Sequence, residues 1–182
     1  MSVYQKCIPT EYVSSIFEIQ YENLKKQGIK SLFFDLDNTI IAYDEQQLSE
    51  QHVSFFNALR KDFNILIMSN SGYNRVSKAM VDLDLPYIWH AKKPLSFGFK
   101  KGLKMLNAKK SETLIIGDQL MTDVFGATRF GIKSILVASV KRKSDRKITK
   151  FNRKLEHHFL KKIEKKLPDL YQERLKTYVD NQ

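Results

Sequence analysis

Two acidic residues with alternate spacing directly follow a short apolar run. Asp35 and Asp37 come immediately after residues 32–34, which are Leu-Phe-Phe. Side chains alternate between the two faces of a strand, so both carboxylates leave the end of the run on one side. Carboxylates that close repel each other unless one is protonated or a cation lies between them. Clustered carboxylate oxygens suit a hard divalent ion such as Mg²⁺, so the pair indicates chemistry on an anion; a turn or helix cap is the structural alternative.

Further polar clusters follow other apolar runs or lie in loops. Ser69 and Asn70 follow the run at 65–68, Lys93 lies in a loop, and Asp118 and Asp123 follow the run at 114–116. Together they offer a nucleophilic carboxylate, an acid or base, hydroxyl and amide donors, an ammonium group and carboxylates for a metal. This set of groups suits phosphoryl transfer, in which catalysis is mostly positioning and charge neutralisation.

The elements that must position these clusters alternate along the chain. Apolar runs predict strands near residues 30–35, 64–68, 113–116 and 134–138, with a short extended stretch at 87–89. Helical spacing predicts helices beginning at Pro9 and Ser49 and others near 73–83, 96–106 and 122–129. Strands alternating with helices indicate an α/β protein with a parallel sheet covered on both faces. The polar clusters then meet at the carboxyl ends of the strands, where ligands bind in such sheets.

These four clusters, in this order, resemble the four motifs of the haloacid dehalogenase (HAD) superfamily. The motif residues are Asp35-Leu36-Asp37-Asn38-Thr39, Ser69-Asn70, Lys93-Pro94 and the segment from Gly117 to Asp123. In detail they resemble subfamily IIIA phosphatases of the bacterial YqeG type, a group similar to the mitochondrial phosphatidylglycerophosphate phosphatase. The resemblance implies a HAD-like (Rossmannoid) three-layer sandwich with a central parallel sheet. About thirty residues separate Thr39 from Ser69, too few for an inserted cap domain, so we expect a cap-less, open site plus terminal helices.

The resemblance also implies catalytic roles. Asp35 corresponds to the nucleophile that forms an aspartyl-phosphate, and Asp37 to the general acid and base. Lys93 corresponds to the cation that neutralises the nucleophile and the phosphate, although the sequence leaves open whether Lys92 takes this role.

Metal and substrate contacts follow from the same resemblance. Mg²⁺ is expected at the acidic positions, which are Asp35, Asp37 (through its backbone carbonyl), Asp118 and Asp123. Asp123 matches a more distant position that acts through water or orients the lysine. The groups expected to contact the substrate phosphate are Thr39, Ser69 and Asn70.

Composition limits the class of protein. The 182 residues fit one domain, and the 42% of hydrophobic residues can build a core. A single cysteine, Cys7, excludes an internal disulfide and a multi-cysteine zinc site. No apolar run approaches the ~18 residues of a membrane-spanning helix, and the N-terminus lacks a signal-peptide core, so we expect a cytoplasmic protein.

Positive charge is concentrated near the C-terminus. Residues 141–166 contain twelve Lys or Arg against three acidic residues and carry most of the net charge of +11. Apolar residues at spacings of three and four predict one amphipathic helix over residues 148–170: Ile148, Phe151, Leu155, Phe159, Ile163, Leu167 and Leu170. Such a helix can lie on an anionic membrane, pack on the domain, or bind nucleic acid, although stacking aromatics are missing from its basic face. We therefore divide the chain into a phosphatase domain with an N-terminal helix (1–140) and a basic helical tail (141–182).

These observations predict a Mg²⁺-dependent phosphomonoesterase acting through an aspartyl-phosphate. An open site and a basic tail favour a phosphate on a large anionic partner. Together with the resemblance to the YqeG type, which is similar to the mitochondrial phosphatidylglycerophosphate phosphatase, they make phosphatidylglycerophosphate at the inner face of the membrane the preferred substrate. This predicts peripheral membrane association and no obligate nucleic acid. The alternatives are phosphatases of nucleotides, nucleic-acid ends or phosphoproteins, and a non-catalytic phospho-accepting or RNA-associated module.

Overall fold

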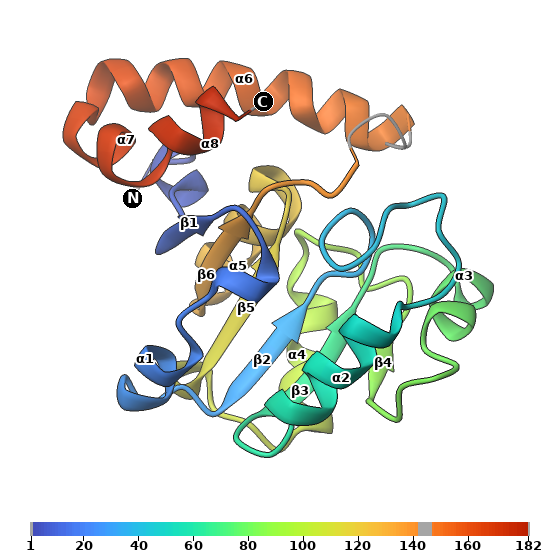
Figure 1. Ribbon diagram of the computed structural model, residues 1–182. Helices are drawn as coiled ribbons and strands as arrows, with labels where there is room; N and C mark the ends of the chain where they lie inside the picture. Colours follow the sequence, from blue (N-terminus) through green and yellow to red (C-terminus); the bar gives the residue numbers. More distant parts are fainter. Residues whose placement is uncertain (1, 142–146, 182) are drawn as a thin grey trace.

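A single six-stranded sheet forms the central layer of the computed structural model, which describes residues 2–141 and 147–181 (Figure 1). All its strand pairs are parallel, in the order β1-β6-β5-β2-β3-β4. The strands are β1 (Glu11–Val13), β2 (Ser31–Phe34), β3 (Asn64–Met68), β4 (Tyr87–Ile88), β5 (Thr113–Gly117) and β6 (Lys133–Val137). The prediction of a parallel α/β sheet is confirmed.

The central strands are buried on both faces. Every residue of β2 and β5 is buried, which is why these strands are continuous apolar runs rather than alternating patterns. In the register, Phe34 lies opposite Ile67 of β3 and Ile116 of β5. Because the strands are parallel and in this register, the residues that follow β2, β3 and β5 meet at one edge of the sheet.

Helices cover both faces, which makes three layers. The helices of the sheet region are α1 (Tyr21–Lys26), α2 (Glu50–Leu59), α3 (Tyr73–Ala79), α4 (Ser96–Met105) and α5 (Phe125–Phe130). Short helical turns are η1 (Tyr4–Cys7), η2 (Ile16–Glu18), η3 (Lys110–Glu112) and the π-helical turn η4 (Leu120–Val124). The neighbouring side chains of Phe33 and Phe34 point to opposite faces: Phe34 packs in the same core cluster as Phe56 of α2, and Phe33 in that of Phe99 of α4.

The predicted N-terminal helix beginning at Pro9 is wrong. Residues Glu11–Val13 form the edge strand β1, which pairs with β6, and a short 3₁₀ turn follows at Ile16–Glu18. The backbone N–H of Thr10 donates to the carbonyl of Ser134 at 2.9 Å, just before the ladder begins. Tyr12 and Val13 suit a half-buried pleated strand better than a helix, and the exposed edge of β6 provides the partner.

Two other predicted helices differ in their bounds. The helix expected over 73–83 ends at Ala79. The helix expected over 122–129 begins as the π-helical turn η4 and continues as α5 to Phe130. This wide turn carries Asp123, so the difference lies at a predicted site residue.

The C-terminal region forms three helices rather than the one amphipathic helix that was predicted. They are α6 (Lys147–Lys166), α7 (Pro168–Arg174) and α8 (Lys176–Asp180), and α7 and α8 fold back beside α6 (Figure 1). A single helix over 148–170 is therefore wrong, because Pro168 cannot extend the preceding helix and instead occupies the first turn of the next.

The apolar face of α6 packs on the domain through its second half. Leu160 and Ile163 are buried in a core cluster with Cys7 of η1 and Leu120 of η4. The side chains of Ile148 and Phe151 lie outside the described residues. The division of the chain at residue 140 stays a prediction.

Candidate active site

A tight loop after β2 holds Asp35 at the end of the central strand. The backbone N–H of Asp35 still donates to the carbonyl of Ile116, at 2.9 Å. The chain then turns through Asn38, whose φ of 64° lies in the left-handed region that Asn tolerates better than most residues. The turn brings back Thr39, whose hydroxyl donates to Asp35 Oδ2 at 3.0 Å. Asp35 is 5% exposed, so its carboxylate is fixed in a buried position.

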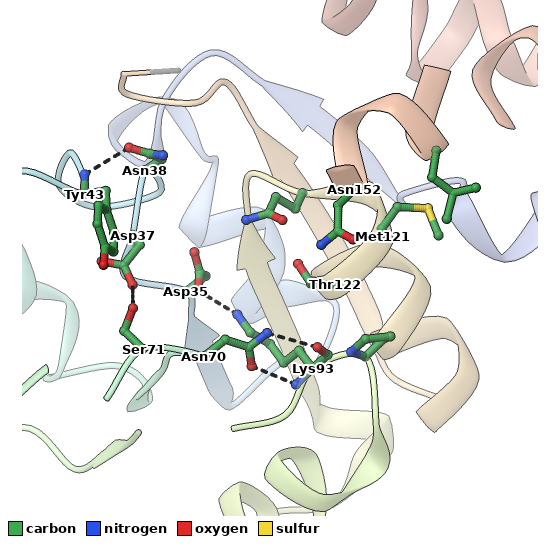
Figure 2. Close-up of a pocket in the computed structure, with 13 residues that line it drawn as sticks. Asp35, Asp37, Asn38, Tyr43, Asn70, Ser71, Lys93, Met121, Thr122 and Asn152 are labelled. Atoms are coloured by element: carbon green, nitrogen blue, oxygen red, sulfur yellow. Dashed lines mark hydrogen bonds and ion pairs between the residues drawn. The ribbon is translucent and has the colours of Figure 1, made fainter. Parts of the chain in front are cut away.

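Lys93, from the loop after β4, neutralises two of the carboxylates. Its Nζ lies 2.6 Å from Asp35 Oδ1 and 2.6 Å from Asp123 Oδ1. Lys93 is 5% exposed, whereas the neighbouring Lys92 is exposed to solvent. The structure therefore brings Lys93, and not Lys92, to the acidic cluster (Figure 2).

Asn70 holds the backbone of Lys93. Its side-chain Oδ1 accepts from the N–H of Lys93 at 2.8 Å, and its Nδ2 donates to the carbonyl of Lys93 at 2.9 Å (Figure 2). The sequence predicts that this amide contacts the substrate phosphate. In the structure both ends of the amide are used to position the lysine.

Asp118 and Asp123 complete an acidic cluster with Asp35. Each of the three buried side chains offers an oxygen within 4.8 Å of the others. Asp123 is held further through Oδ2, which accepts from the N–H of Gln119 at 3.2 Å and from a neighbouring hydroxyl. A Cβ at Gly117 would lie 2.4 Å from Asp123 Cγ, so this close approach requires glycine.

Asp37 points away from this cluster toward two serines and an arginine. Its Oδ2 accepts from Ser69 Oγ at 2.9 Å and from Ser71 Oγ at 2.6 Å. Its Oδ1 lies 3.1 Å from Nε of Arg75 on α3. Sequence reasoning missed Ser71 and Arg75 as partners of Asp37; Ser71 lies only two residues beyond the predicted site residue Ser69, which was the available signal.

Thr39 and Ser69, expected to contact substrate, bond to acidic side chains in the structure. The Thr39 hydroxyl donates to Asp35 and lies 3.5 Å from Asp118 Oδ1. Ser69 is fully buried and donates to Asp37. All the predicted site residues are thus brought to one edge of the sheet, but the polar side chains among them mainly orient the carboxylates.

The charges of these residues do not balance. Four carboxylates face the side chains of Lys93 and Arg75. Burial raises the pKa of Asp35 well above its usual value; Lys93 opposes this rise, and the neighbouring carboxylates add to it. Burial lowers the pKa of Lys93, but the carboxylates of Asp123 and Asp35 outweigh that effect and raise it. With all four carboxylates ionised, the site carries a net charge of minus two, and this charge and the hard oxygen donors fit a divalent cation.

A pocket of about 360 Å³ opens over the cluster. Asp35, Asp37 and Lys93 line it, and so does Asn152 of α6 (Figure 2). Leu155 of α6 is a further lining residue, so the tail contributes to the pocket wall. The expected cap-less site therefore has one wall that comes from the C-terminal helix rather than from an inserted domain.

A parallel sheet with this acidic cluster and lysine at its carboxyl edge defines the HAD class of hydrolases, and the comparisons agree. Residues 90–165 match the family described as HAD-hydrolase-like. The probable phosphatase YqeG of Bacillus subtilis (strain 168) is 35% identical over 160 residues, which are 87% of this chain and 92% of that protein. The chain therefore belongs to the HAD-like hydrolases of the YqeG type, and it is a phosphatase.

Solved structures support the fold. The HAD family enzyme bt-2542 from Bacteroides thetaiotaomicron, a magnesium complex, aligns with a TM-score of 0.52 at 14% identity, covering 64% of this chain and 97% of that one. The cobalt-bound deoxy-D-mannose-octulosonate 8-phosphate phosphatase YrbI from Haemophilus influenzae aligns with a TM-score of 0.50 at 13% identity, covering 75% and 90%. The HAD-like three-layer fold is confirmed.

Proposed function

We propose that the protein is a Mg²⁺-dependent phosphomonoesterase that acts through an aspartyl-phosphate on Asp35. The observation that carries this proposal is the contact of Lys93 Nζ with both Asp35 and Asp123 at 2.6 Å, on the inner side of a pocket. A carboxylate attacks an anionic phosphate only where cations offset the repulsion between them, and here the lysine is already in place.

Asp35, Asp118 and the backbone carbonyl of Asp37 would hold the Mg²⁺. The bound ion supplies positive charge that neutralises the phosphate oxygens and the nucleophile. The magnesium complex of bt-2542, which shares the fold, supports this choice of metal. Both carboxylate oxygens of Asp123 are engaged, by Lys93 and by Gln119 and Thr122, so we assign Asp123 the role of orienting the lysine.

We propose that Asp35 and Asp37 carry out the two steps of the reaction. The Asp35 carboxylate forms a bond to phosphorus while the ester P–O bond breaks, and Asp37 gives a proton to the leaving oxygen. Asp37 then takes a proton from the water that attacks phosphorus, which breaks the Asp35–phosphorus bond and releases inorganic phosphate. Ser69 and Ser71 fix the Asp37 carboxyl for these transfers.

The substrate we propose is phosphatidylglycerophosphate, a phosphate monoester on an anionic lipid, at the inner face of the membrane. Support comes from the basic segment at 141–166 and from the apolar pocket residues Met121 and Leu155. Within the residues that the structure describes, no helix is long and apolar enough to cross a membrane. We propose peripheral association, supported by the basic segment at 141–166, with residues 1–140 as the phosphatase domain and 141–182 as a tail that completes its pocket.

Turnover measurements test the mechanism and the substrate separately. Phosphate release from a generic soluble phosphoester should require Mg²⁺ and disappear in Asp35→Asn, whereas Asp62→Asn, an exposed control, should retain it. Unchanged turnover in Asp35→Asn would refute the nucleophile. Phosphatidylglycerophosphate in anionic vesicles should be turned over faster than soluble phosphoesters, including nucleotides and phosphopeptides. If vesicles bring no advantage, the lipid substrate is wrong while the phosphatase assignment stands.

A further inference from the structure

Several exposed apolar side chains lie on the same side of the molecule as the active-site pocket, at or near the carboxyl edge of the sheet. Ten large apolar side chains are exposed among the described residues, and six belong to the carboxyl edge of the sheet: Tyr73, Trp89, Leu95, Phe97, Val140 and Leu155. Tyr73 begins α3, Trp89 follows β4, and Leu95 and Phe97 lie at the start of α4. The backbone of Val140 bonds to the pocket residue Asn38, and Leu155 lines the pocket itself.

Leu95 and Phe97 are the most exposed residues of this group, at 55% and 58%. They line a second hollow of about 450 Å³, together with Lys100 and Arg129. This hollow shares Pro94 with the catalytic pocket, so the two apolar side chains lie beside the mouth of the site.

The segment of the chain that carries Trp89, Leu95 and Phe97 is positively charged. Residues 85–111 contain seven lysines and no Asp or Glu. Lys92 Nζ lies 5.6 Å from the ring centre of Phe97, and Lys101 Nζ lies 5.2 Å from that of Trp89. We call Trp89, Lys92, Leu95, Phe97, Lys100 and Lys101 the basic-aromatic rim. Apolar, aromatic and basic side chains mixed in this way are typical of surfaces that enter the headgroup region of anionic bilayers.

The second half of α6 offers little apolar surface for such a contact. Leu160 and Ile163 of α6 are buried against the domain, and Phe159 and Leu167 pack at the edge of the same cluster. The second half of α6 therefore presents to solvent mainly its charged residues, which attract an anionic surface but insert nothing into it.

We propose that the basic-aromatic rim docks the protein on the surface of an anionic lipid bilayer. Leu95 and Phe97 enter the interface, the three lysines contact lipid phosphates, and the pocket mouth next to Pro94 faces the headgroups. This inference deepens the proposed function, since it explains how a lipid phosphate reaches Asp35. Docking itself needs no turnover and can be measured without it.

Vesicle co-sedimentation tests the proposal. All variants are made in the Asp35→Asn protein, which should hydrolyse no lipid during the binding measurement. The vesicles contain about one-third phosphatidylglycerol in phosphatidylcholine, and pure phosphatidylcholine vesicles serve as the uncharged comparison. We expect Leu95→Ala/Phe97→Ala to bind about tenfold more weakly or worse, because two apolar groups leave the interface. The triple Gln variant of Lys92, Lys100 and Lys101 should lose roughly 10- to 100-fold in affinity and much of its salt dependence.

Controls come from residues outside the basic-aromatic rim, at the C-terminal end of α4 and just beyond it. Met105→Ala removes an exposed apolar side chain, and Lys104→Gln/Lys109→Gln removes two charges; both should bind like the parent. Equal losses in these controls, or no loss in the rim variants, would overturn the proposal. Stronger effects of the rim variants on a single-stranded oligonucleotide than on vesicles would overturn it too.

The test of bilayer docking can fail or succeed independently of the test of the proposed lipid substrate. If rim-dependent vesicle binding persists while phosphatidylglycerophosphate is not turned over, docking stands and the substrate fails. If the lipid is turned over but Leu95→Ala/Phe97→Ala neither weakens binding nor slows that turnover, the substrate stands and docking fails. Circular-dichroism melts of each variant, matched to the parent, show that lost binding is not lost folding.

Discussion

Asp118→Asn tests whether the acidic cluster sacrifices stability for metal binding. The carboxylate oxygens of Asp35, Asp118 and Asp123 lie within 4.8 Å of one another and are buried. At that distance one pair of charges repels by about 3.5 kcal/mol at an effective dielectric constant of about 20. Lys93 offsets part of this repulsion, and the raised pKa of Asp35 lets a proton relieve more of it. We therefore expect a net gain of about 1–2 kcal/mol in the unfolding free energy of the metal-free variant.

The measurement is thermal and urea unfolding, with EDTA and then with Mg²⁺. In EDTA, Asp118→Asn should melt roughly 2–8 °C above the parent, the shift expected for 1–2 kcal/mol in a chain of this size. At about 100 times its Kd, Mg²⁺ should add roughly 2.7 kcal/mol to the stability of the parent and much less to that of the variant. The exposed control Asp44→Asn should keep the full Mg²⁺ effect.

A variant that is less stable than the parent in EDTA and equally stabilised by Mg²⁺ would refute this reasoning. Asn retains an oxygen that can accept from Thr39, which lies 3.5 Å from Asp118 Oδ1, so loss of that contact would not explain such a result.

Four further predictions follow from the contacts of the site and the tail. Lys93→Met should lower kcat by at least about 10³-fold and destabilise the metal-free protein by roughly 3 kcal/mol in urea unfolding, because the buried carboxylates of Asp35 and Asp123 lose the ammonium group that they contact. Asn70→Ala should cost about 1–3 kcal/mol of stability and reduce kcat with little change in KM, since it frees the lysine backbone; a rise in KM alone would instead indicate direct phosphate contact. Because burial raises the pKa of Asp35 in the fold, the metal-free protein should gain stability as the pH falls through that raised pKa toward the ordinary value of 3.8, and melts of Asp35→Asn in EDTA should lack this contribution. Burial, aided by the charge of Glu156, raises the pKa of the Cys7 thiol to about 12, so a thiol reagent at pH 8 should label it only after unfolding or release of α6.

The inner strands could be predicted from the sequence because their signal is local. β2, β3 and β5 are short apolar runs since both faces of a central parallel strand are buried, and each run ends where a polar cluster begins. The edge strand β1 could not be predicted in this way. Its three residues are partly exposed, and only the pairing with β6, more than 120 residues away in the chain, makes them a strand.

The contacts of the site could likewise be predicted only in part. The spacing and order of the motifs were enough to predict that Asp35, Lys93 and Asp118 come together, because parallel topology brings strand ends to one edge. The pairing of Asn70 with the backbone of Lys93 joins residues 23 positions apart through a loop conformation that no local pattern encodes. The same holds for Arg75, which reaches Asp37 from the next helix.

The tail partly encloses the active site, although the protein has no inserted cap domain. The motif spacing leaves no room for an inserted domain, yet Asn152 and Leu155 of α6 form one wall of the pocket. A pocket of about 360 Å³ is at the small end of the range for small-molecule sites, so it can enclose a phosphate headgroup but not the acyl chains of a lipid. Under the proposed docking, the rest of a large substrate leaves the pocket past Pro94, toward Leu95 and Phe97. The helix that closes one side of the site thus determines which side is left for the partner.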